Sequence, residues 1–404
     1  MTKNESATRT RQDFHRLLVL IAVSCLDLMG SAMVFPLIPF YAQKLNISPV
    51  AIGTIFSSFF VAQLIAAPIW GRVSDRYGRR PALLIGLGCL GVGYLIFGFA
   101  NSVWMLLLSR IVQGAGGGTT GVTQAYVSDT VRPEDRARAL GWLSAATNLG
   151  TMIGPVVGSF ATYWGQAGPG VLAGALCLVN FIFAWKLLPE SRKAGAPGAV
   201  RKPVWHGVWM VVRHPSGTLQ RLILIYAVGM FGFSTMSAVL SLFLGAEFGF
   251  TERTIGYVFF YIGIFSVIMR SALIGPIVDK IGEPWSMRIG ALSVIGGLLG
   301  YAIAPNLWIL GSIIPLIPIG TALLFPATTA LMSKASAKSE VGATMGIAQT
   351  FAGISRLIAP VTSTSLFQYV GHRAPFVFAA AAVAIVTLLA LQVQASPVES
   401  VQSA

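Results

Sequence analysis

The chain has 404 residues, of which 55% are hydrophobic and only 10% are charged, and its mean hydropathy is +0.74. A soluble globular chain carries about 25% charged residues, so this chain has too few charges to coat a water-soluble surface. Composition therefore excludes a soluble enzyme, a disordered protein and a secreted disulfide scaffold. The net charge of +14 does not indicate nucleic acid, because no basic stripe interleaved with aromatic residues occurs.

Apolar runs of about 20 residues, the length of a helix that crosses a bilayer, recur along the whole chain. These continuous runs predict an all-α membrane protein and differ from the alternating strands of a membrane β-barrel. Most of the 28 lysines and arginines fall in loops on one side of the predicted membrane, which places both termini in the cytoplasm. The twelve predicted spans are residues 17–41, 50–70, 81–100, 103–127, 138–163, 169–188, 219–246, 254–278, 285–304, 306–332, 342–369 and 375–393.

The first predicted span contains Asp27, the acidic residue that we place deepest in the hydrocarbon. It lies about ten residues into the span, hence about 15 Å deep at 1.5 Å per residue. An ionised and unpaired carboxylate is costly there, whereas a nearby cation favours the ionised form. A group balanced between these effects can change protonation, so Asp27 is the predicted proton-coupling residue, with Arg110 of the fourth span as its partner. The alternative is a fixed pair that only holds the two spans together.

Two halves of the chain share their motifs. The loop after the second span reads GRVSDRYG and the loop after the eighth reads GPIVDKIG, with identical spacing. In spans 5 and 11 a glycine precedes a proline, Pro155 or Pro360, by the same number of residues. An offset of about half the chain indicates two parallel six-helix repeats. The predicted parts are an N-terminal bundle (1–188), a cytoplasmic linker (189–218) and a C-terminal bundle (219–404).

The linker is the longest predicted loop and is rich in proline, glycine and basic residues. Its segment Val204–Val212 is expected to lie flat on the membrane surface, where it anchors the linker. A partner-binding role for this segment is the alternative.

Four segments, in order along the chain, resemble the major facilitator superfamily and its twelve-span drug–proton antiporters. The first half is most similar to bacterial tetracycline exporters, but spans 3 and 9 lack the acidic residues of those exporters, which weakens the case for tetracycline as substrate. The four segments are Asp27–Ala42, Gly71–Arg80, Ser109–Gly121 and Gly150–Gly158.

This resemblance implies the major facilitator fold and proton-coupled efflux of lipophilic small molecules across the bacterial inner membrane by alternating access. We further expect a monomer that uses the proton gradient and has no cofactor, and the histidines and cysteines do not resemble metal ligands. Alternatives are a proton-coupled exporter of one endogenous metabolite, sugar or lipid, or a tetracycline-specific exporter. A receptor or an intramembrane enzyme lacks support, because no nucleophile–base or metal-ligand set occurs within the spans.

The resemblance also assigns a gating role to the loop after span 2. There Asp75 is expected to dock against the start of span 11 near Gly342 and to hold the halves together, whereas the neighbouring arginines could be topology signals alone. The expected gating residues are Gly71, Asp75, Gly78, Arg79, Asp129 and Asp279.

Small residues recur every fourth position in span 5, at Gly150, Gly154 and Gly158, with Pro155 beside them. They predict a close helix contact, which in the resembled family seals against proton leak. Ordinary small-residue packing is the alternative.

The predicted substrate cavity is apolar and aromatic with one carboxylate, which suits lipophilic, neutral or cationic compounds. Arg270 and Arg356 have no intramembrane acid in their own half, so they either bond to helix carbonyls, snorkel, or meet anionic groups of the substrate. For Gln113 a plain helix–helix hydrogen bond is the alternative. The candidate cavity residues are Phe35, Gln113, Tyr226, Phe231, Phe233, Tyr257, Tyr261 and Phe325.

Overall fold

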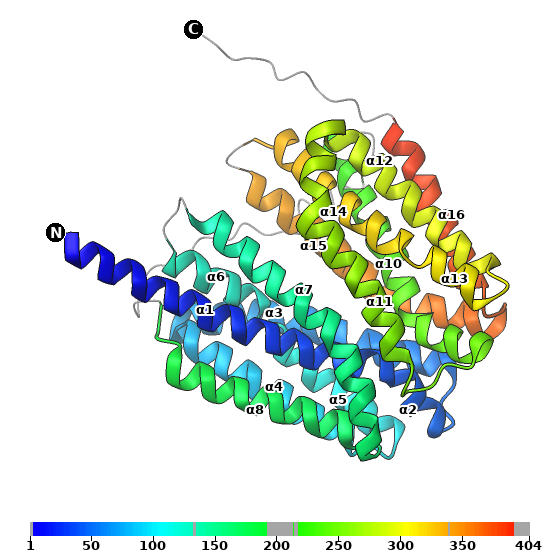
Figure 1. Cartoon of the computed structure of the whole chain (residues 1–404), viewed down its shortest axis with the longest axis horizontal. Coiled ribbons are helices and arrows are strands. Elements are labelled where there is room, and N and C mark those ends of the chain that lie inside the picture. The colour runs from blue at the N-terminus through cyan, green and yellow to red at the C-terminus, as the bar shows by residue number, and fades with distance from the viewer. Residues whose placement is uncertain (1–2, 132–134, 192–212, 214–216, 338–339, 392–404) are drawn as a thin grey trace, which may run out of the picture. The chain divides into compact units, whose positions relative to one another are not determined.

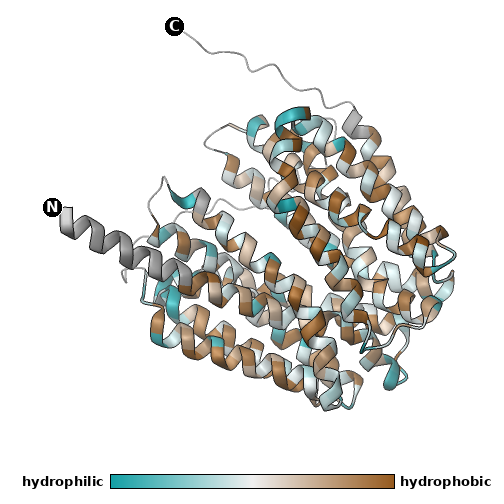
Figure 2. Cartoon of the chain, in the orientation of Figure 1, coloured by the Kyte–Doolittle hydropathy of each residue, from teal (hydrophilic) through white to brown (hydrophobic). Residues whose placement is uncertain are grey.

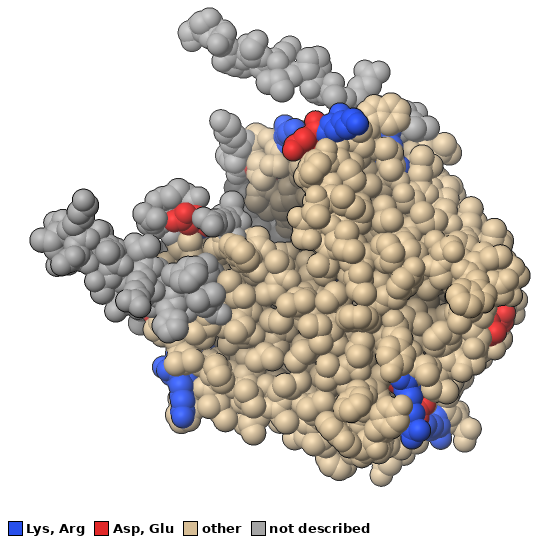
Figure 3. Space-filling model, viewed as in Figure 1, with Lys and Arg blue, Asp and Glu red and all other residues tan. Residues whose placement is uncertain are grey.

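The computed structural model describes residues 3–131, 135–191, 213, 217–337 and 340–391. These residues form helices and no strand, which confirms the all-α prediction (Figure 1). Seven continuous helical stretches among them are long and apolar enough to cross a membrane. Apolar residues run along the helices (Figure 2), and charged side chains show at only a few places on the face seen in Figure 3. The segment Val204–Val212 lies outside the described residues.

The first six predicted spans correspond to helices, with two interruptions. Pro36 and Pro39 lack the N–H group that continues an α-helix, and span 1 passes through a short 3₁₀ turn there. Span 4 is broken at Gly118 and Thr119, after a run of glycines. The elements are α1 (Lys3–Val34), η1 (Phe35–Leu37), α2 (Ile38–Lys44), α3 (Pro49–Tyr77), α4 (Arg79–Gly98), α5 (Val103–Gly117), α6 (Thr120–Thr130), α7 (Arg136–Ala161), η3 (Thr162–Trp164) and α8 (Gly168–Leu187).

The last six predicted spans are helical too. The eighth span ends and the ninth begins within the bounds of α12 (Ile274–Ile303). The chain breaks at Gly78 between α3 and α4, where φ is 106° and ψ is 162°, and it breaks in much the same way between the eighth and ninth spans at Gly282, where φ is 77° and ψ is 163°. Glycine adopts this left-handed region at no steric cost, and Pro284 follows it. The elements are α10 (Thr218–Phe248), α11 (Ile255–Ile268), the π-helical turn η4 (Met269–Leu273), α12 (Ile274–Ile303), α13 (Leu307–Ile313), α14 (Leu316–Ala335), α15 (Val341–Tyr369) and α16 (Ala374–Leu391).

The chain divides into two compact units. Unit 1 comprises residues 1–200, 237–267 and 360–372, and unit 2 comprises residues 201–236, 268–359 and 373–404. Unit 1 therefore contains the first six spans together with the end of α10, most of α11 and the end of α15. The predicted domain boundaries follow the sequence repeat instead, and they stay predictions.

Both halves use the same close helix contact. In unit 1 a methyl group added at Gly116 of α5 would lie 2.7 Å from the carbonyl oxygen of Gly86 in α4. In unit 2 a methyl group added at Gly320 of α14 would lie 2.7 Å from the carbonyl oxygen of Gly290 in α12. The two glycine pairs are separated by the same number of residues as Asp75 and Asp279. Equivalent positions thus make equivalent contacts, as a duplicated six-helix bundle requires.

The glycines of span 5 lie directly against the helix that carries Asp27. Methyl groups added at Gly150, Gly154 and Gly158 of α7 would lie 2.3, 2.6 and 2.3 Å from carbonyl oxygens of α1. Those oxygens belong to Cys25, Met29 and Met33, so the contact runs past Asp27 on both sides. Backbone lies against backbone here, and no side chain could be added without moving a helix.

Candidate functional site

Polar side chains from four helices of unit 1 gather in the interior around Asp27. Asp27 of α1 is half-buried, and Tyr94 of α4 lies within electrostatic range of Asp27, of Arg110 in α5 and of Cys177 in α8. Tyr94 and Arg110 are only 1% and 3% exposed. The fold therefore brings the predicted carboxylate and the predicted arginine near one tyrosine, Tyr94, which sequence reasoning missed.

Arg110 does not pair directly with a carboxylate. Its Nε and Nη2 atoms are buried without a hydrogen-bond partner, and its guanidinium carbon lies 5.5 Å from the centre of the Phe97 ring. The cation–π contact supplies part of the missing stabilisation. Asp27 and Arg110 form no ion pair in the part of the chain that the structure describes. This arrangement therefore differs from the alternative of a fixed ion pair that holds spans 1 and 4 together.

Two further buried groups at this cluster lack partners. The Tyr94 hydroxyl makes no hydrogen bond of normal geometry, although Ser31 lies close enough to affect it. Asn180 of α8 donates from Nδ2 to the carbonyl oxygen of Val23 at 2.9 Å, yet its Oδ1 atom has no partner. Buried polar atoms without partners are costly, and ordered water is what usually satisfies them. These atoms are thus available to a water molecule that enters the interior of unit 1.

Gln113 has a structural contact. Its side chain is 1% exposed, and its Nε2 atom donates to the carbonyl oxygen of Gly93 at 2.9 Å. This is the helix–helix hydrogen bond that the sequence left as the alternative, and it joins α5 to α4.

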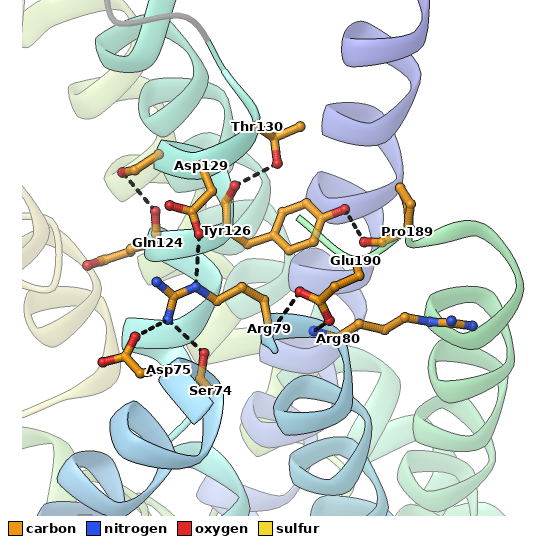
Figure 4. A network of polar contacts seen from close by, with 11 residues as sticks. Ser74, Asp75, Arg79, Arg80, Gln124, Tyr126, Asp129, Thr130, Pro189 and Glu190 are labelled. Carbon is orange, nitrogen blue, oxygen red and sulfur yellow. Dashed lines mark hydrogen bonds and ion pairs between the residues drawn. The ribbon is translucent and has the colours of Figure 1, made fainter. Parts of the chain in front are cut away.

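A second polar network lies at the loop between α3 and α4 (Figure 4). Arg79 is 8% exposed, and its Nη1 atom donates to Asp75 Oδ1 at 2.9 Å and to Ser74 Oγ at 2.8 Å. Its Nε atom donates to Asp129 Oδ2 of α6 at 2.9 Å. One guanidinium therefore joins the ends of α3, α4 and α6.

Glu190, which sequence reasoning missed, completes this network from beyond the end of α8. Its carboxylate accepts hydrogen bonds from the backbone N–H groups of Arg79 at 2.8 Å and Arg80 at 3.1 Å, the first residues of α4. A helix N-terminus has unpaired N–H groups and a positive dipole end, so it binds an anion well. The loop needs glycine at Gly78, because φ is 106° and an added methyl group would lie 2.4 Å from Glu190 Oε2.

We expect Arg79→Gln to lower the free energy of unfolding by about 1.5–3 kcal/mol, because hydrogen bonds to charged groups are lost and two carboxylates keep no cation between them. Thermal unfolding of the purified protein in detergent measures the change. The matched control is Arg72→Gln, which changes an exposed residue of α3 and should stay within about 0.5 kcal/mol of the wild type. Equal effects of the two substitutions would contradict the bridging role of Arg79.

Unit 1 also contains contacts between the two sequence halves, at the loops with few basic residues. Lys44 at the end of α2 lies 2.7 Å from Glu252 Oε1, and Val50 N donates to Gln368 Oε1 at 3.1 Å. In α7, Ser159 Oγ accepts a hydrogen bond from Gly256 N of α11 at 3.0 Å. These loops of the two sequence halves are thus joined within unit 1.

The Lys44–Glu252 pair makes a prediction about pH. Burial raises the pKa of Glu252, but the hydrogen bond and charge of Lys44, with the charge of Arg253, lower it more, so the pKa lies below its usual value. A carboxyl with a lowered pKa stabilises the fold fully above the ordinary value of about 4.3, and that contribution disappears as the pH falls through the lowered pKa.

A double-mutant cycle with Lys44→Met and Glu252→Gln should therefore give a coupling of about 0.2–1 kcal/mol at neutral pH, the range for partly exposed pairs. The coupling should vanish in acid below the pKa of Glu252. Thermal unfolding of the four proteins at both pH values measures it, and a coupling that is unchanged in acid would show that the ion pair is not its source.

The aromatic candidates are divided between the units. In unit 2, Tyr226 and Phe325 lie together, with ring centres 5.4 Å apart, and Phe231 contacts Phe378. In unit 1, Phe35 packs on Phe56, with ring centres 4.8 Å apart. The remaining candidates are Phe233, which is half-buried, and Tyr261 and Tyr257, which are 38% and 66% exposed. Asp279, the expected counterpart of Asp75, is exposed.

A duplicated helical bundle with apolar spans and ionisable groups in its interior is the architecture of a membrane transporter. The chain belongs to the Major Facilitator Superfamily, whose sequence pattern matches residues 20–320 and 224–404. It is a multi-pass membrane transporter of small molecules and not an enzyme. Among the described residues no group of three His, Cys, Asp or Glu side chains could hold a metal ion.

The chain is similar to drug-resistance proteins along most of its length. It is 25% identical over 354 residues to the tetracycline resistance protein, class B, of Escherichia coli, covering 87% of this chain and 88% of that one. It is 26% identical over 378 residues to multidrug resistance protein 2 of Bacillus subtilis (strain 168), covering 90% and 91%. Its fold resembles the crystal structure of the nucleoside transporter NupG, with a TM-score of 0.77, 12% identity and coverage of 93% and 99%.

Proposed function

We propose that this chain is a proton-coupled exporter of lipophilic small molecules, which works as a monomer in the bacterial inner membrane with both termini in the cytoplasm. The drug-resistance relatives support export of drugs. The distribution of basic loops supports the orientation.

The observation that carries the proposal is the polar cluster at Asp27. Arg110 keeps its charge at all relevant pH values and cannot carry the proton, so Asp27 is the carrier. The neutral carboxylic acid suits the apolar interior, and the ionised form is favoured by Arg110 and by water on the unpartnered atoms of Tyr94 and Asn180. Each proton that moves inward contributes about 2.3 kcal/mol per 100 mV to outward transport.

Alternating access then requires two sets of contacts to open in turn. The outer set is Lys44–Glu252 and Ser159–Gly256, which are formed in this structure. The inner set is the Arg79 network, where Asp75 is proposed to dock at the start of span 11 and Asp279 to act in the second half. The tight α1–α7 contact at Gly150, Gly154 and Gly158 is proposed to exclude water beside Asp27 and so to prevent proton leak.

Transport assays in proteoliposomes test the function. Vesicles with an acidic interior should accumulate lipophilic drugs from a panel, because protons leave as the substrate enters, and vesicles without a pH gradient should not. If accumulation instead needs an alkaline interior, protons enter together with the substrate, which is symport. If one metabolite alone accumulates, the protein is an exporter of an endogenous compound. Either result would reject proton-coupled drug efflux.

A further inference from the structure

Two arginines lie within the predicted spans of the second half and have no counterion there. Arg270 lies in the π-helical turn η4 and Arg356 in α15, and both are half-buried. Neither forms an ion pair or a hydrogen bond with another described residue, and the Arg270 Nε atom is buried without a partner. A guanidinium keeps its charge, so each needs an anion or water.

The acidic residues of unit 2 lie too far along the helices to serve as counterions. Among its described residues these are Asp279, Glu283 and Glu340. Asp279 is nine residues from Arg270 and thus about 13 Å along a helix, and Glu340 is sixteen residues from Arg356, about 24 Å. Glu283 already has a partner, because its Oε1 atom lies 2.5 Å from Lys334 Nζ. The described residues of unit 2 therefore supply no ion pair to these arginines.

The two arginines converge on one place. Each lies within electrostatic range of Tyr226 in α10. Tyr226 accepts a hydrogen bond from Gln349 Nε2 of α15 at 3.1 Å, and Gln349 lies two turns before Arg356 on the same face of that helix. The Ser355 hydroxyl, which donates to the carbonyl oxygen of Ala227 at 2.8 Å, holds α15 against α10.

The helix geometry at Arg270 is also unusual. A π-helical turn inserts an extra residue into the helix and is frequent at functional sites. On one side of the turn, Met269 is buried against Ala322 and Leu323 of α14. The turn is therefore fixed by packing, and it sets the direction of the next side chain, Arg270. The edge-on contact of Tyr226 with Phe325 adds an aromatic surface beside the two cations.

We propose that Arg270 and Arg356, with Tyr226 and Gln349, form a binding site for the anionic group of an amphipathic organic anion, such as an aromatic carboxylate. Guanidinium groups bind carboxylates through two parallel charged hydrogen bonds, and the aromatic surface takes the apolar body. The assignment to the transported molecule rests on the proposed export function. It replaces the neutral or cationic substrates expected from sequence by substrates that carry a negative charge.

The test compares two ligands that share an apolar body. Isothermal titration of the purified full chain in phosphatidylcholine nanodiscs measures the affinity for 2-naphthoate and for its neutral analogue 2-naphthamide. The carboxylate should bind about tenfold more tightly than the amide, and Arg270→Gln or Arg356→Gln should each weaken naphthoate binding about tenfold while naphthamide binding is unchanged. Unchanged naphthamide binding also shows that the variants are folded. The matched control is Arg253→Gln, in the loop before α11, which should bind both ligands as the wild type does.

Equal affinities of the two ligands for the wild type would overturn the proposal, as would selectivity that survives both arginine substitutions. A second titration in nanodiscs that contain the anionic lipid phosphatidylglycerol tests whether a lipid headgroup occupies the site. If this lipid strongly inhibits naphthoate binding, the natural ligand is the lipid and not the transported molecule. Arginine-dependent naphthoate binding without gradient-driven transport of any compound would reject the export function and leave the anion site standing.

Discussion

Replacement of Asp27 by asparagine should abolish accumulation driven by a pH gradient while substrate exchange between the two sides of the membrane continues. Asparagine has nearly the shape of aspartic acid but cannot release a proton, so it fixes the neutral form of the side chain. Gradient-driven uptake into proteoliposomes should fall by about tenfold or more, whereas exchange of labelled for unlabelled substrate without a gradient needs no proton.

The matched control is Glu283→Gln. Glu283 contacts Lys334 near the predicted loop between spans 8 and 9, outside the Asp27 cluster, so its loss should leave coupling intact. Uphill transport that persists in the Asp27→Asn protein would show that another group carries the proton. Loss of both uptake and exchange would show that Asp27 is needed for substrate movement itself, which is a different role.

Replacement of Gly150 by alanine should lower the free energy of unfolding by about 1–3 kcal/mol, the usual cost of overpacking. The added methyl group would lie 2.3 Å from the carbonyl oxygen of Cys25. Because that atom belongs to the backbone of α1, it cannot rotate away, and α1 and α7 must separate. The measurement is thermal unfolding of the purified protein in detergent.

Gly141 offers the matched control on the same helix. A methyl group added there meets nothing within 4 Å. Gly141→Ala should therefore be neutral or stabilise the protein by about 0.5–1 kcal/mol, since alanine loses less backbone entropy in a helix than glycine does. If the two alanine variants unfold at the same temperature, the α1–α7 contact is not as close as described. Passive proton leak into vesicles should rise in the Gly150 variant alone if the contact also seals the membrane.

The positions of the spans could be predicted from the sequence because hydrophobic length is a local property. Asp27 could be singled out because an acid is rare at that depth. The repeat was visible because loop motifs keep their spacing. The break at Gly282, within the bounds of α12, is the counterpart of the turn at Gly78 between α3 and α4, because each glycine ends one copy of the repeated motif.

The polar neighbours of Asp27 could not be predicted from the sequence. A tyrosine or an asparagine within an apolar run is ordinary, and the roles of Tyr94 and Asn180 depend on α8 packing against both α1 and α4 and on the Tyr94 ring reaching α1 near Gly30. A single asparagine in a span does signal a helix contact, because its amide must find a partner in the membrane. Glu190 was missed since its contact with the start of α4 joins residues more than a hundred positions apart.

The absence of a direct Asp27–Arg110 ion pair bears on the mechanism. A tight buried pair would hold the aspartate ionised, because separation of the charges is costly. In this cluster Tyr94 lies within electrostatic range of both groups, and the Tyr94 hydroxyl and two guanidinium nitrogens of Arg110 have no hydrogen-bond partner. Such an arrangement lets the charge on Asp27 change without a large rearrangement of the helices.

Infrared difference spectroscopy on the reconstituted protein tests the central claim most directly, because it reports whether a carboxyl group carries a proton. Addition of a transported substrate should change the absorption of a protonated carboxylic acid, and this change should be missing from the Asp27→Asn protein and present in Glu283→Gln. A carboxyl signal that is the same with and without substrate, or that persists in the Asp27→Asn protein, would contradict a proton carrier at position 27.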